Sequence, residues 1–341
     1  MTIYYIAILF LALFGVRYCH NGIHKDYLDK TQCQAINGIF IMVVFLRHIH
    51  PYIHSKHSFT SLLDQYFLII DNNIGQLLVV TFLFYSGFGI AESIKNKGSV
   101  YINKFPQRRL LSTLLNFDIA ILCFLLLNIL LGIKMSATQI GLSFIGWDSI
   151  GNSNWYIFVI LLCYIISYVA YVMNSKLYIL IVTVLTFISV LLLFYVKPTW
   201  WYDTMLCYPM GMIWSKFKSI LDNYIENNYF IIFALIILTF IVLHISPLLY
   251  LHGLTSNAKS IIFAIIVLLL TMKIRIRNKY LIWMGAHLFP LYIYQRLPMI
   301  ALSNYNKGEW ISSNLHLYVI ISFATTCLIA YNYHYWHIKL N

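Results

Sequence analysis

Long apolar runs alternate with short polar segments along almost the whole chain. About eleven of these runs approach the roughly 20 residues that a helix needs to cross a bilayer. They cover residues 2–17, 36–54, 72–93, 110–133, 154–173, 177–196, 200–217, 228–248, 257–273, 280–302 and 312–333. Because the backbone finds no water to hydrogen-bond inside a bilayer, such runs form helices. The pattern therefore predicts an all-α, polytopic membrane helix bundle with about eleven transmembrane helices.

The composition excludes a water-soluble fold. Of the 341 residues, 61% are hydrophobic and 10% are charged, and the mean hydropathy is +0.77, so too few polar side chains remain to cover a soluble surface. The formal charge of +12 lies in the segments between the apolar runs, where lysine and arginine indicate membrane orientation. We expect a multi-pass protein of the cell membrane, embedded in the lipid bilayer, with no nucleic-acid partner.

The positive residues separate into two groups when successive loops are placed on alternate sides of the membrane. One side receives Arg17, Lys25, Lys30, Lys95, Lys97, Lys104, Arg108, Arg109, Lys176, Lys216, Lys218, Lys273, Arg275, Arg277, Lys279 and Lys339. The other side receives Lys56, Lys134, Lys197, Lys259 and Lys307. Cytoplasmic loops carry the excess of lysine and arginine. The N-terminus is therefore expected outside the cell and the C-terminus in the cytoplasm.

The cysteines and the first apolar run carry little chemistry. The six cysteines stand singly, without a C-x-x-C pair, so they are expected to be small hydrophobic residues and not ligands of a metal. No metal is needed for the chemistry considered below. The first run lacks a basic n-region and an A-x-A-like cleavage site, so we expect it to remain as a span.

One apolar helix carries the most prominent polar groups. Asn37 and His48 are about three turns apart and share one face of this helix. An ionisable residue within a span is a functional candidate, and a neutral imidazole can take a proton from a hydroxyl. His48 is therefore the candidate general base, with Arg47 as a cationic neighbour. Asp118, inside a later span, is expected to pair with a cation or to orient His48.

A second block has features of a donor site. Small residues at Ser86 and Gly87 would let a helix or an elongated ligand approach the backbone closely. Arg108 and Arg109 follow a basic loop at the mouth of the next helix. Guanidinium groups bind phosphates well, so we expect them to hold the phosphates of a nucleotide-bearing donor such as acetyl-CoA. Glu92 is expected to pair with Lys95 or Lys97.

Several segments, in order, resemble motifs of the acyltransferase-3 family of integral membrane proteins, which O-acylate cell-surface glycans. Residues 37–48 follow the spacing of the family's R/K-G-I-x-I-x-x-V-V-x-x-H helix. The other similar segments are 82–88, 109–117, 154–157, 209–216 and 285–295. The likeness covers roughly residues 30 to 335, and it rests on the order and spacing of all the segments together.

The resemblance implies a membrane acyltransferase-like domain of ten core helices over residues 31–341. Residues 1–30 would then form an extra transmembrane helix and a cytoplasmic loop. It also implies an O-acetyltransferase that moves an acetyl group from cytoplasmic acetyl-CoA to a hydroxyl of a cell-surface or exported polysaccharide, either a glycan or a lipid-linked glycan. His48 would act as base, Asn37, Arg47 or Trp155 would stabilise the oxyanion, and Trp155 with Tyr156 would bind the acceptor.

The chain departs from the family motifs at several positions. Asn37 stands in place of an arginine or lysine, Ser112 replaces an arginine, and Asn116 replaces a proline. Gln295 replaces a late histidine, and Ile160 stands where one branch of the family has a glutamate. These departures leave open a weakly active or inactive relative.

Three alternatives to an acyltransferase remain open. A flippase of lipid-linked saccharide would be expected to show broken helices in matched halves of the chain. A glycan polymerase would be expected to carry a large outer loop. The third alternative is a non-enzymatic membrane partner in polysaccharide export.

Overall fold

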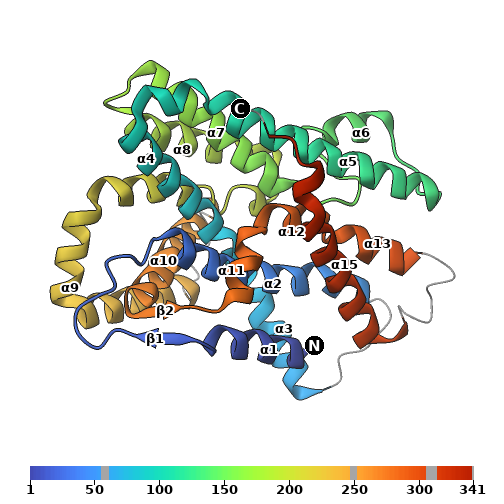
Figure 1. Ribbon diagram of the computed structural model, residues 1–341, viewed down its shortest axis with the longest axis horizontal. Helices are drawn as coiled ribbons and strands as arrows, with labels where there is room; N and C mark the ends of the chain where they lie inside the picture. Colours follow the sequence, from blue (N-terminus) through green and yellow to red (C-terminus); the bar gives the residue numbers. More distant parts are fainter. Residues whose placement is uncertain (55–60, 246–251, 305–312, 340–341) are drawn as a thin grey trace.

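The computed structural model describes residues 1–54, 61–245, 252–304 and 313–339, and most of this part of the chain is helical (Figure 1). Lys56 and Lys307, assigned above to the outer side, lie outside the described residues. The α-helices are α1 (Thr2–Leu13), α2 (Lys30–His54), α3 (Leu62–Ile74), α4 (Val80–Asn103), α5 (Ser112–Leu130), α6 (Ala137–Ser143), α7 (Trp155–Met173), α8 (Tyr178–Val196), α9 (Cys207–Ile245), α10 (His252–Lys273), α11 (Lys279–Ala286), α12 (Leu288–Tyr294), α13 (Arg296–Asn304) and α15 (Leu315–Trp336).

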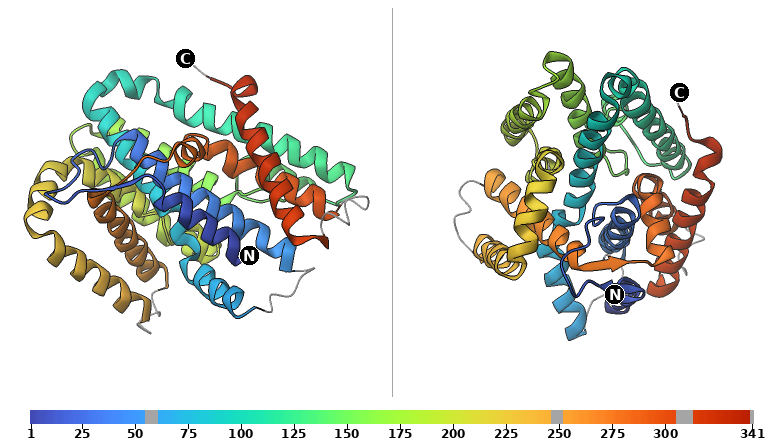
Figure 2. Two further views of the ribbon diagram at one scale, coloured as in Figure 1. Left: turned by 60° about the horizontal axis from the view of Figure 1, so that its bottom comes forward. Right: turned by 60° about the vertical axis from the view of Figure 1, so that its left-hand side comes forward.

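Shorter elements join these helices. They are the 3-10 helices η1 (Gly75–Val79) and η3 (Thr199–Trp201), the π-helix η2 (Pro106–Leu111), and the strands β1 (Val16–Tyr18) and β2 (Ile274–Ile276). The helices surround α2 and α4, which run through the middle of the bundle in both further views (Figure 2). Because α2 and α4 carry the main candidate residues, those residues lie inside the bundle.

Among the described residues, eight helices are long and apolar enough to cross a membrane. This confirms an all-α bundle of the multi-pass membrane type, but four expected spans have other shapes. The runs at 200–217 and 228–248 meet in α9, which begins at Cys207 and consists of two helical arms joined at a kink at Asn228. The run at 280–302 is broken into α11, α12 and α13, since Pro290 and Pro298 cannot continue a helix that precedes them. The first run forms α1, a helix of 12 residues.

Two pairs of helices cross with their backbones in close contact. A Cβ on Gly87 of α4 would collide with the backbone of α9, and a Cβ on Gly211 of α9 would collide with the backbone of α4. Gly38 of α2 and Gly285 of α11 have the same relation. Without a hydrophobic driving force between helices in lipid, such close packing is a main source of cohesion. These glycines therefore fix the helices that carry the candidate site.

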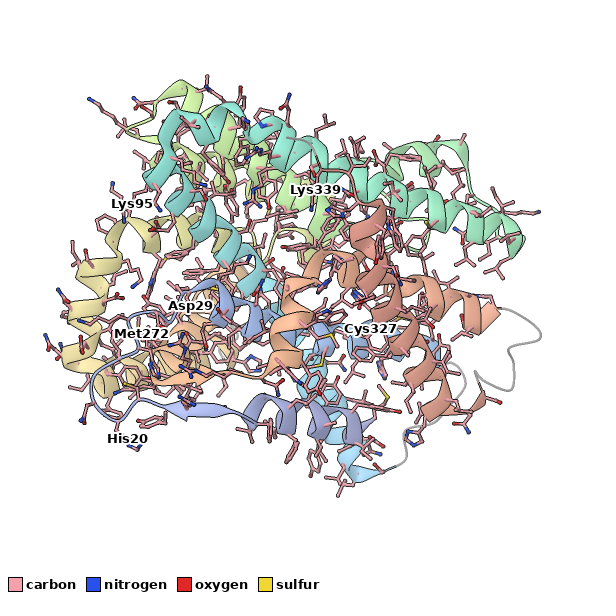
Figure 3. The ribbon with its side chains drawn as sticks, viewed as in Figure 1. His20, Asp29, Lys95, Met272, Cys327 and Lys339 are labelled. Atoms are coloured by element: carbon pink, nitrogen blue, oxygen red, sulfur yellow. The ribbon has the colours of Figure 1, made fainter. Side chains whose placement is uncertain are left out.

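A small ribbon joins the N-terminal segment to the core. Strand β1 pairs antiparallel with β2, with Arg17 opposite Arg275. The Arg275 guanidinium binds two carboxylates, with Nη1 at 2.6 Å from Asp26 and Nη2 at 3.0 Å from Asp29. Figure 3 labels Met272, whose carbonyl accepts a hydrogen bond from the backbone amide of His24 at 2.7 Å, and Asp29, which pairs with Arg275. The N-terminal segment is thus held to the later helices by backbone and charge contacts.

Candidate active site

A cavity of about 400 Å³ lies where α2, α4, α7 and α12 meet the start of α5, and we call it the central cavity. Four residues predicted from the sequence line it together, namely Asn37, Ser86, Arg109 and Tyr156. The Thr81 hydroxyl donates a hydrogen bond to Oδ1 of Asn37 at 3.3 Å, which orients the Asn37 side chain at the cavity wall. The volume is in the range of small-molecule sites.

Tyrosines give the central cavity much of its polarity. Tyr85, Tyr156, Tyr164 and Tyr292 line it, and the Tyr164 hydroxyl lies 3.2 Å from Oγ of Ser86. The hydroxyls of Tyr85 and Tyr292 are buried and have no hydrogen-bond partner among the described residues. A buried hydroxyl without a partner costs free energy. The cavity is therefore suited to a ligand that brings hydrogen-bond acceptors such as carbonyl oxygens.

A second cavity, of about 460 Å³, adjoins the central cavity, and we call it the basic cavity. It is lined by Lys97, Lys104, Arg108 and Arg109, so Arg109 belongs to both cavities. The Nε of Arg109 donates a hydrogen bond to the Tyr101 hydroxyl at 3.3 Å. Four cations around one cavity favour binding of a multiply charged anion. Arg109 lies where the basic cavity meets the central cavity.

Local backbone geometry places these cations. Gly98 interrupts α4 with φ 53° and ψ −133°, a conformation that side chains with a Cβ rarely adopt, so the chain bends there. After Asn103 the chain enters η2, which begins with Pro106 and has the wider turn of a π-helix. Single π-helical turns often occur at functional sites because they redirect side chains. The bend and the wide turn bring residues from both sides of the loop to one cavity.

His48 lies beside the central cavity and is not one of its lining residues. Its ring centroid is 6.0 Å from that of Tyr292, whose ring is 5.2 Å from that of Tyr156. Its Nδ1 is 3.5 Å from Oγ of Ser153, at the long limit of a hydrogen bond. Asn37 and His48 are eleven residues apart on α2, which is roughly 16 Å along the helix axis. The central cavity includes Asn37 and ends before it reaches His48. Tyr292 connects the cavity to the imidazole.

Other predicted residues lie away from the central cavity. Arg47 points toward η1, where its Nη2 would be 3.8 Å from a Cβ at Gly75. Gly87 faces α9 and packs helices together instead of lining the cavity. Trp155 contacts the neighbouring Tyr156 edge to face, with ring centroids 6.1 Å apart. Only Arg109 of the arginine pair reaches the central cavity, because Arg108 lines the basic cavity alone.

The pairing expected of Asp118 is absent from the described part of the chain. Asp118 makes no ion pair there, and one of its buried carboxylate oxygens has no hydrogen-bond partner. The helices α7 and α12, which pack on α5, contain no lysine or arginine. Arg296, at the start of α13, donates instead to the Tyr52 hydroxyl at 3.3 Å. Asp118 is not among the residues that line the central cavity.

The sequence reasoning missed several residues of the site. Tyr164 follows Tyr156 by two turns on the same face of α7, so the helical period alone points to it. Tyr292 lies inside segment 285–295, which resembles a family motif, but the motif assigns no function to this position. Ser153 and Tyr85 carry no signal of their own, since isolated serines and tyrosines are common near membrane interfaces. Only the packing of α12 and α4 against α2, and of α4 against α7, brings these residues to the site.

Three of the positions that depart from the family motifs have clear surroundings. Ile160 lines the central cavity, which therefore lacks a carboxylate at this position. Ser112 and Asn116 bind the backbone of Ile338 through hydrogen bonds of 2.8 to 2.9 Å, and so attach the C-terminal segment to α5. Ser112 and Asn116, which stand where the family motif has an arginine and a proline, thus contact the end of the chain.

Gln295 lies away from the central cavity. It lines a small hollow against α15, and its amide nitrogen donates to the Tyr292 carbonyl at 3.0 Å.

Comparisons of the chain with models of protein families, with curated proteins and with solved structures find no match. The function must therefore be argued from the cavities and the residues that line them.

Proposed function

We propose that the protein is a membrane-bound O-acyltransferase of the acyltransferase-3 type. It would move an acetyl group from cytoplasmic acetyl-CoA to a hydroxyl of a cell-surface or exported polysaccharide. One observation carries the proposal: Arg109 joins a basic cavity to a central cavity that continues to Tyr292, next to His48. A donor with charged phosphates and a long, thin acyl carrier matches a basic cavity followed by a polar cavity whose end, at Tyr292, adjoins the His48 ring.

The donor occupies both cavities in this proposal. The phosphates of acetyl-CoA are held by Lys97, Lys104, Arg108 and Arg109, since each can form a charge-assisted hydrogen bond. The pantetheine arm passes Arg109 into the central cavity, where its amide carbonyls accept hydrogen bonds. The free hydroxyl of Tyr85 is one donor for such a carbonyl. The thioester then lies near Tyr292, at the end of the cavity beside His48.

The transfer itself needs a base and an oxyanion donor. His48 takes the proton from the acceptor hydroxyl, and the oxygen forms a bond to the thioester carbonyl carbon. The oxyanion accepts a hydrogen bond from the Tyr292 hydroxyl, which lines the cavity and whose ring lies next to His48. The C–S bond then breaks, the thiolate of coenzyme A takes the proton from the imidazolium, and the ester is released. The Ser153 hydroxyl lies 3.5 Å from Nδ1 of His48, so a hydroxyl group can approach the imidazole from this side.

The proposal also assigns an orientation in the cell membrane, with the N-terminus outside and the C-terminus in the cytoplasm. Loops assigned to the cytoplasm by their excess of lysine and arginine contact one another in the structure. The Lys218 ammonium donates to the Lys25 carbonyl at 3.2 Å, and the Lys273 ammonium donates to the Gly22 carbonyl at 2.6 Å. These contacts bring three separate basic segments together, which supports assigning them to the same side of the membrane.

The test compares ester-linked acetate on the surface glycan of cells that express the wild-type protein or His48→Ala. We expect the variant to lose nearly all of the acetate gained with the wild type, because it removes the imidazole that contacts Tyr292 at the end of the central cavity. The matched control is His316→Ala, whose exposed imidazole bonds to the Tyr4 hydroxyl at 2.9 Å. This control should retain full acetylation, and both variants should accumulate to wild-type amounts.

Two outcomes would contradict the proposal. Equal acetate with His48→Ala and with the wild type would remove the catalytic role of His48. Loss of the whole polysaccharide on deletion of the protein, instead of loss of its acetate alone, would point to a flippase or polymerase of lipid-linked saccharide.

A further inference from the structure

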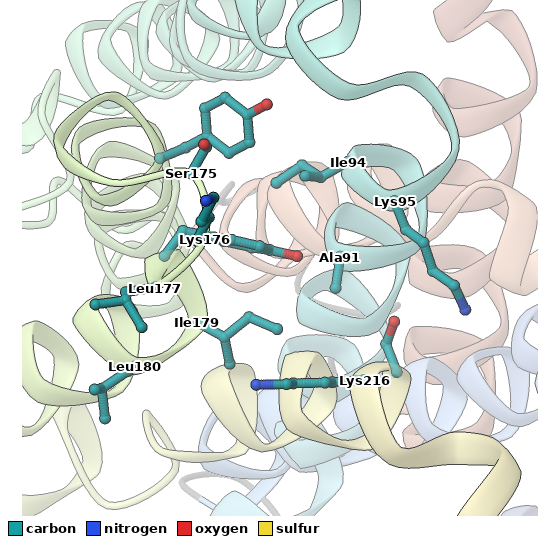
Figure 4. A pocket seen from close by; sticks show the side chains of 12 residues that line it. Ala91, Ile94, Lys95, Ser175, Lys176, Leu177, Ile179, Leu180 and Lys216 are labelled. Atoms are coloured by element: carbon teal, nitrogen blue, oxygen red, sulfur yellow. The ribbon is translucent and has the colours of Figure 1, made fainter.

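A third cavity, of about 460 Å³, lies on another side of α4, and we call it the lysine cavity (Figure 4). It is formed by α4, by the turn between α7 and α8, and by α9. Each of these elements contributes one lysine, namely Lys95, Lys176 and Lys216. Lys97, which lines the basic cavity, follows Lys95 by two residues and so points about 200° away around the helix. The two cavities are therefore separate.

The charges around the lysine cavity are unbalanced. Glu92 accepts a hydrogen bond from the Ser215 hydroxyl at 2.7 Å and pairs with Lys95 at 3.6 Å, as expected from the sequence. Lys176 and Lys216 have no acidic partner within the described ranges. Like charges that line one cavity without a counterion repel each other. An anion between these lysines would remove this repulsion.

The turn that carries Lys176 is held in place. The Asn174 side chain accepts hydrogen bonds from the backbone amides of Lys176 and Leu177 at 2.9 and 3.0 Å. The rings of Tyr171 and Tyr178, which flank the turn, pack edge to face at 5.8 Å. Both rings also line the cavity. The position of Lys176 thus follows from a fixed turn, and binding an anion needs little reorganisation.

The lysine cavity opens onto an apolar surface that faces the lipid. Leu177 and Leu180 form its rim and are 52% and 59% exposed. Beyond Leu180, the exposed residues Val184, Ile188 and Leu191 continue at helical spacing along α8. A free phosphate would use only the lysines. A phospholipid would use the lysines for its headgroup and the stripe on α8 for an acyl chain.

We propose that the lysine cavity binds the phosphodiester headgroup of an anionic phospholipid, with one acyl chain along the exposed stripe of α8. Lysine clusters between membrane helices on the cytoplasmic side recognise such headgroups. All three lysines lie in segments assigned to that side. The assignment does not depend on acyl transfer, since the lysine cavity shares no lining residue with the central or basic cavity.

The test uses the full-length protein purified in a neutral detergent, with phosphatidylglycerol or phosphatidylcholine added in steps and thermal stability measured. We expect phosphatidylglycerol to stabilise the wild type at lower concentration than phosphatidylcholine. Loss of one lysine should weaken the binding of an anionic lipid about fivefold. The variant Lys176→Gln/Lys216→Gln, which loses two, should therefore need about 25-fold more phosphatidylglycerol for the same stabilisation. Its response to phosphatidylcholine should not change. The control Lys134→Gln removes an exposed lysine distant in sequence from the cavity and should behave as the wild type.

Three results would overturn the proposal. The first is an unchanged response of the double variant to phosphatidylglycerol. The second is an equal loss in Lys134→Gln, which would indicate general attraction of an anionic lipid to a basic protein. The third is protection by glycerol 3-phosphate that equals the protection by phosphatidylglycerol and is lost in the double variant, which would assign the lysine cavity to a soluble phosphate ester.

Discussion

Single hydroxyl groups distinguish the central cavity from an ordinary gap between helices. Tyr85 and Tyr292 each bury a hydroxyl without a partner among the described residues, whereas Tyr164 pairs with Ser86. Unsatisfied buried polar groups are rare in proteins, and those at functional sites often bind a ligand. Tyr292 is the more informative of the two because its ring also contacts His48. The role proposed for it is hydrogen bonding to the oxyanion.

The variant Tyr292→Phe tests this role at the residue scale. It keeps the ring that packs between His48 and Tyr156 and removes only the hydroxyl. We expect the turnover number for acetyl transfer to fall by about 100-fold, as for loss of one oxyanion donor, with little change in KM for acetyl-CoA. The measurement is acetyl transfer by the purified protein.

The matched control for this variant is Tyr294→Phe, whose ring packs on Tyr333 away from the central cavity. An equal loss of turnover in both variants, or none in Tyr292→Phe, would exclude the proposed role.

Close crossings of helices determine where the candidate residues lie. The α4–α9 crossing at Gly87 and Gly211 and the α2–α11 crossing at Gly38 and Gly285 leave no space for a Cβ. Gly87 directly follows Ser86, so the contact that places Gly87 against α9 also turns Ser86 toward the central cavity. The sequence predicts that the small residues of segment 82–88 let a helix or an elongated ligand approach closely, and in the structure Gly87 admits a helix while Ser86 lines the cavity.

A pair of glycine variants tests this packing at the element scale. Gly87→Ala would place a methyl group against the backbone carbonyl of Tyr208, so we expect a destabilisation of about 1–3 kcal/mol or failure to accumulate. Gly89→Ala is the control, because no atom lies within 4 Å of its Cβ position and alanine favours a helix. Thermal unfolding in detergent measures both. Equal stability of the two variants would show that the backbones are not in such close contact.

At the scale of the whole molecule, segments that charge counting assigns to the cytoplasm contact one another in the fold. Lys25, Lys218 and Lys273 come from separate loops and meet through hydrogen bonds to backbone carbonyls. The C-terminal segment is attached to the start of α5 through Ile338, near the two arginines of the basic cavity. The donor site proposed here therefore lies at the end of the bundle assigned to the cytoplasm.

Reporter fusions test this orientation. A reporter that is active only in the cytoplasm should be active when fused after the last residue of the chain. A reporter that is active only outside should be active when inserted beside Lys134, in the exposed turn after α5. The reverse pattern would invert the orientation and place the basic cavity outside the cell, where acetyl-CoA is not available. Activity of both reporters on one side would contradict the predicted number of crossings between these two points.

Local sequence predicts the helices well and their interruptions poorly. Runs of apolar residues near bilayer length are enough to predict membrane helices, since an unpaired backbone is too costly in lipid. The same runs do not show that α9 continues through residues 218–227, which contain neither glycine nor proline. Nor do they show that Pro290 and Pro298 break the run after residue 280 into three helices. Hydropathy measures burial in lipid and carries little information on helix continuity.

Composition and local spacing predict the membrane class and the charge asymmetry, and they mark Asn37, Ser86, Arg109 and Tyr156 as candidates without showing that these residues meet. The packing of the helices brings these four residues to one cavity and places Tyr292 between that cavity and His48. It alone also showed that Arg47 and Gly87 point elsewhere. The reason is physical, since a residue's position on its helix follows from local geometry, whereas the surface it faces depends on how distant helices pack against it.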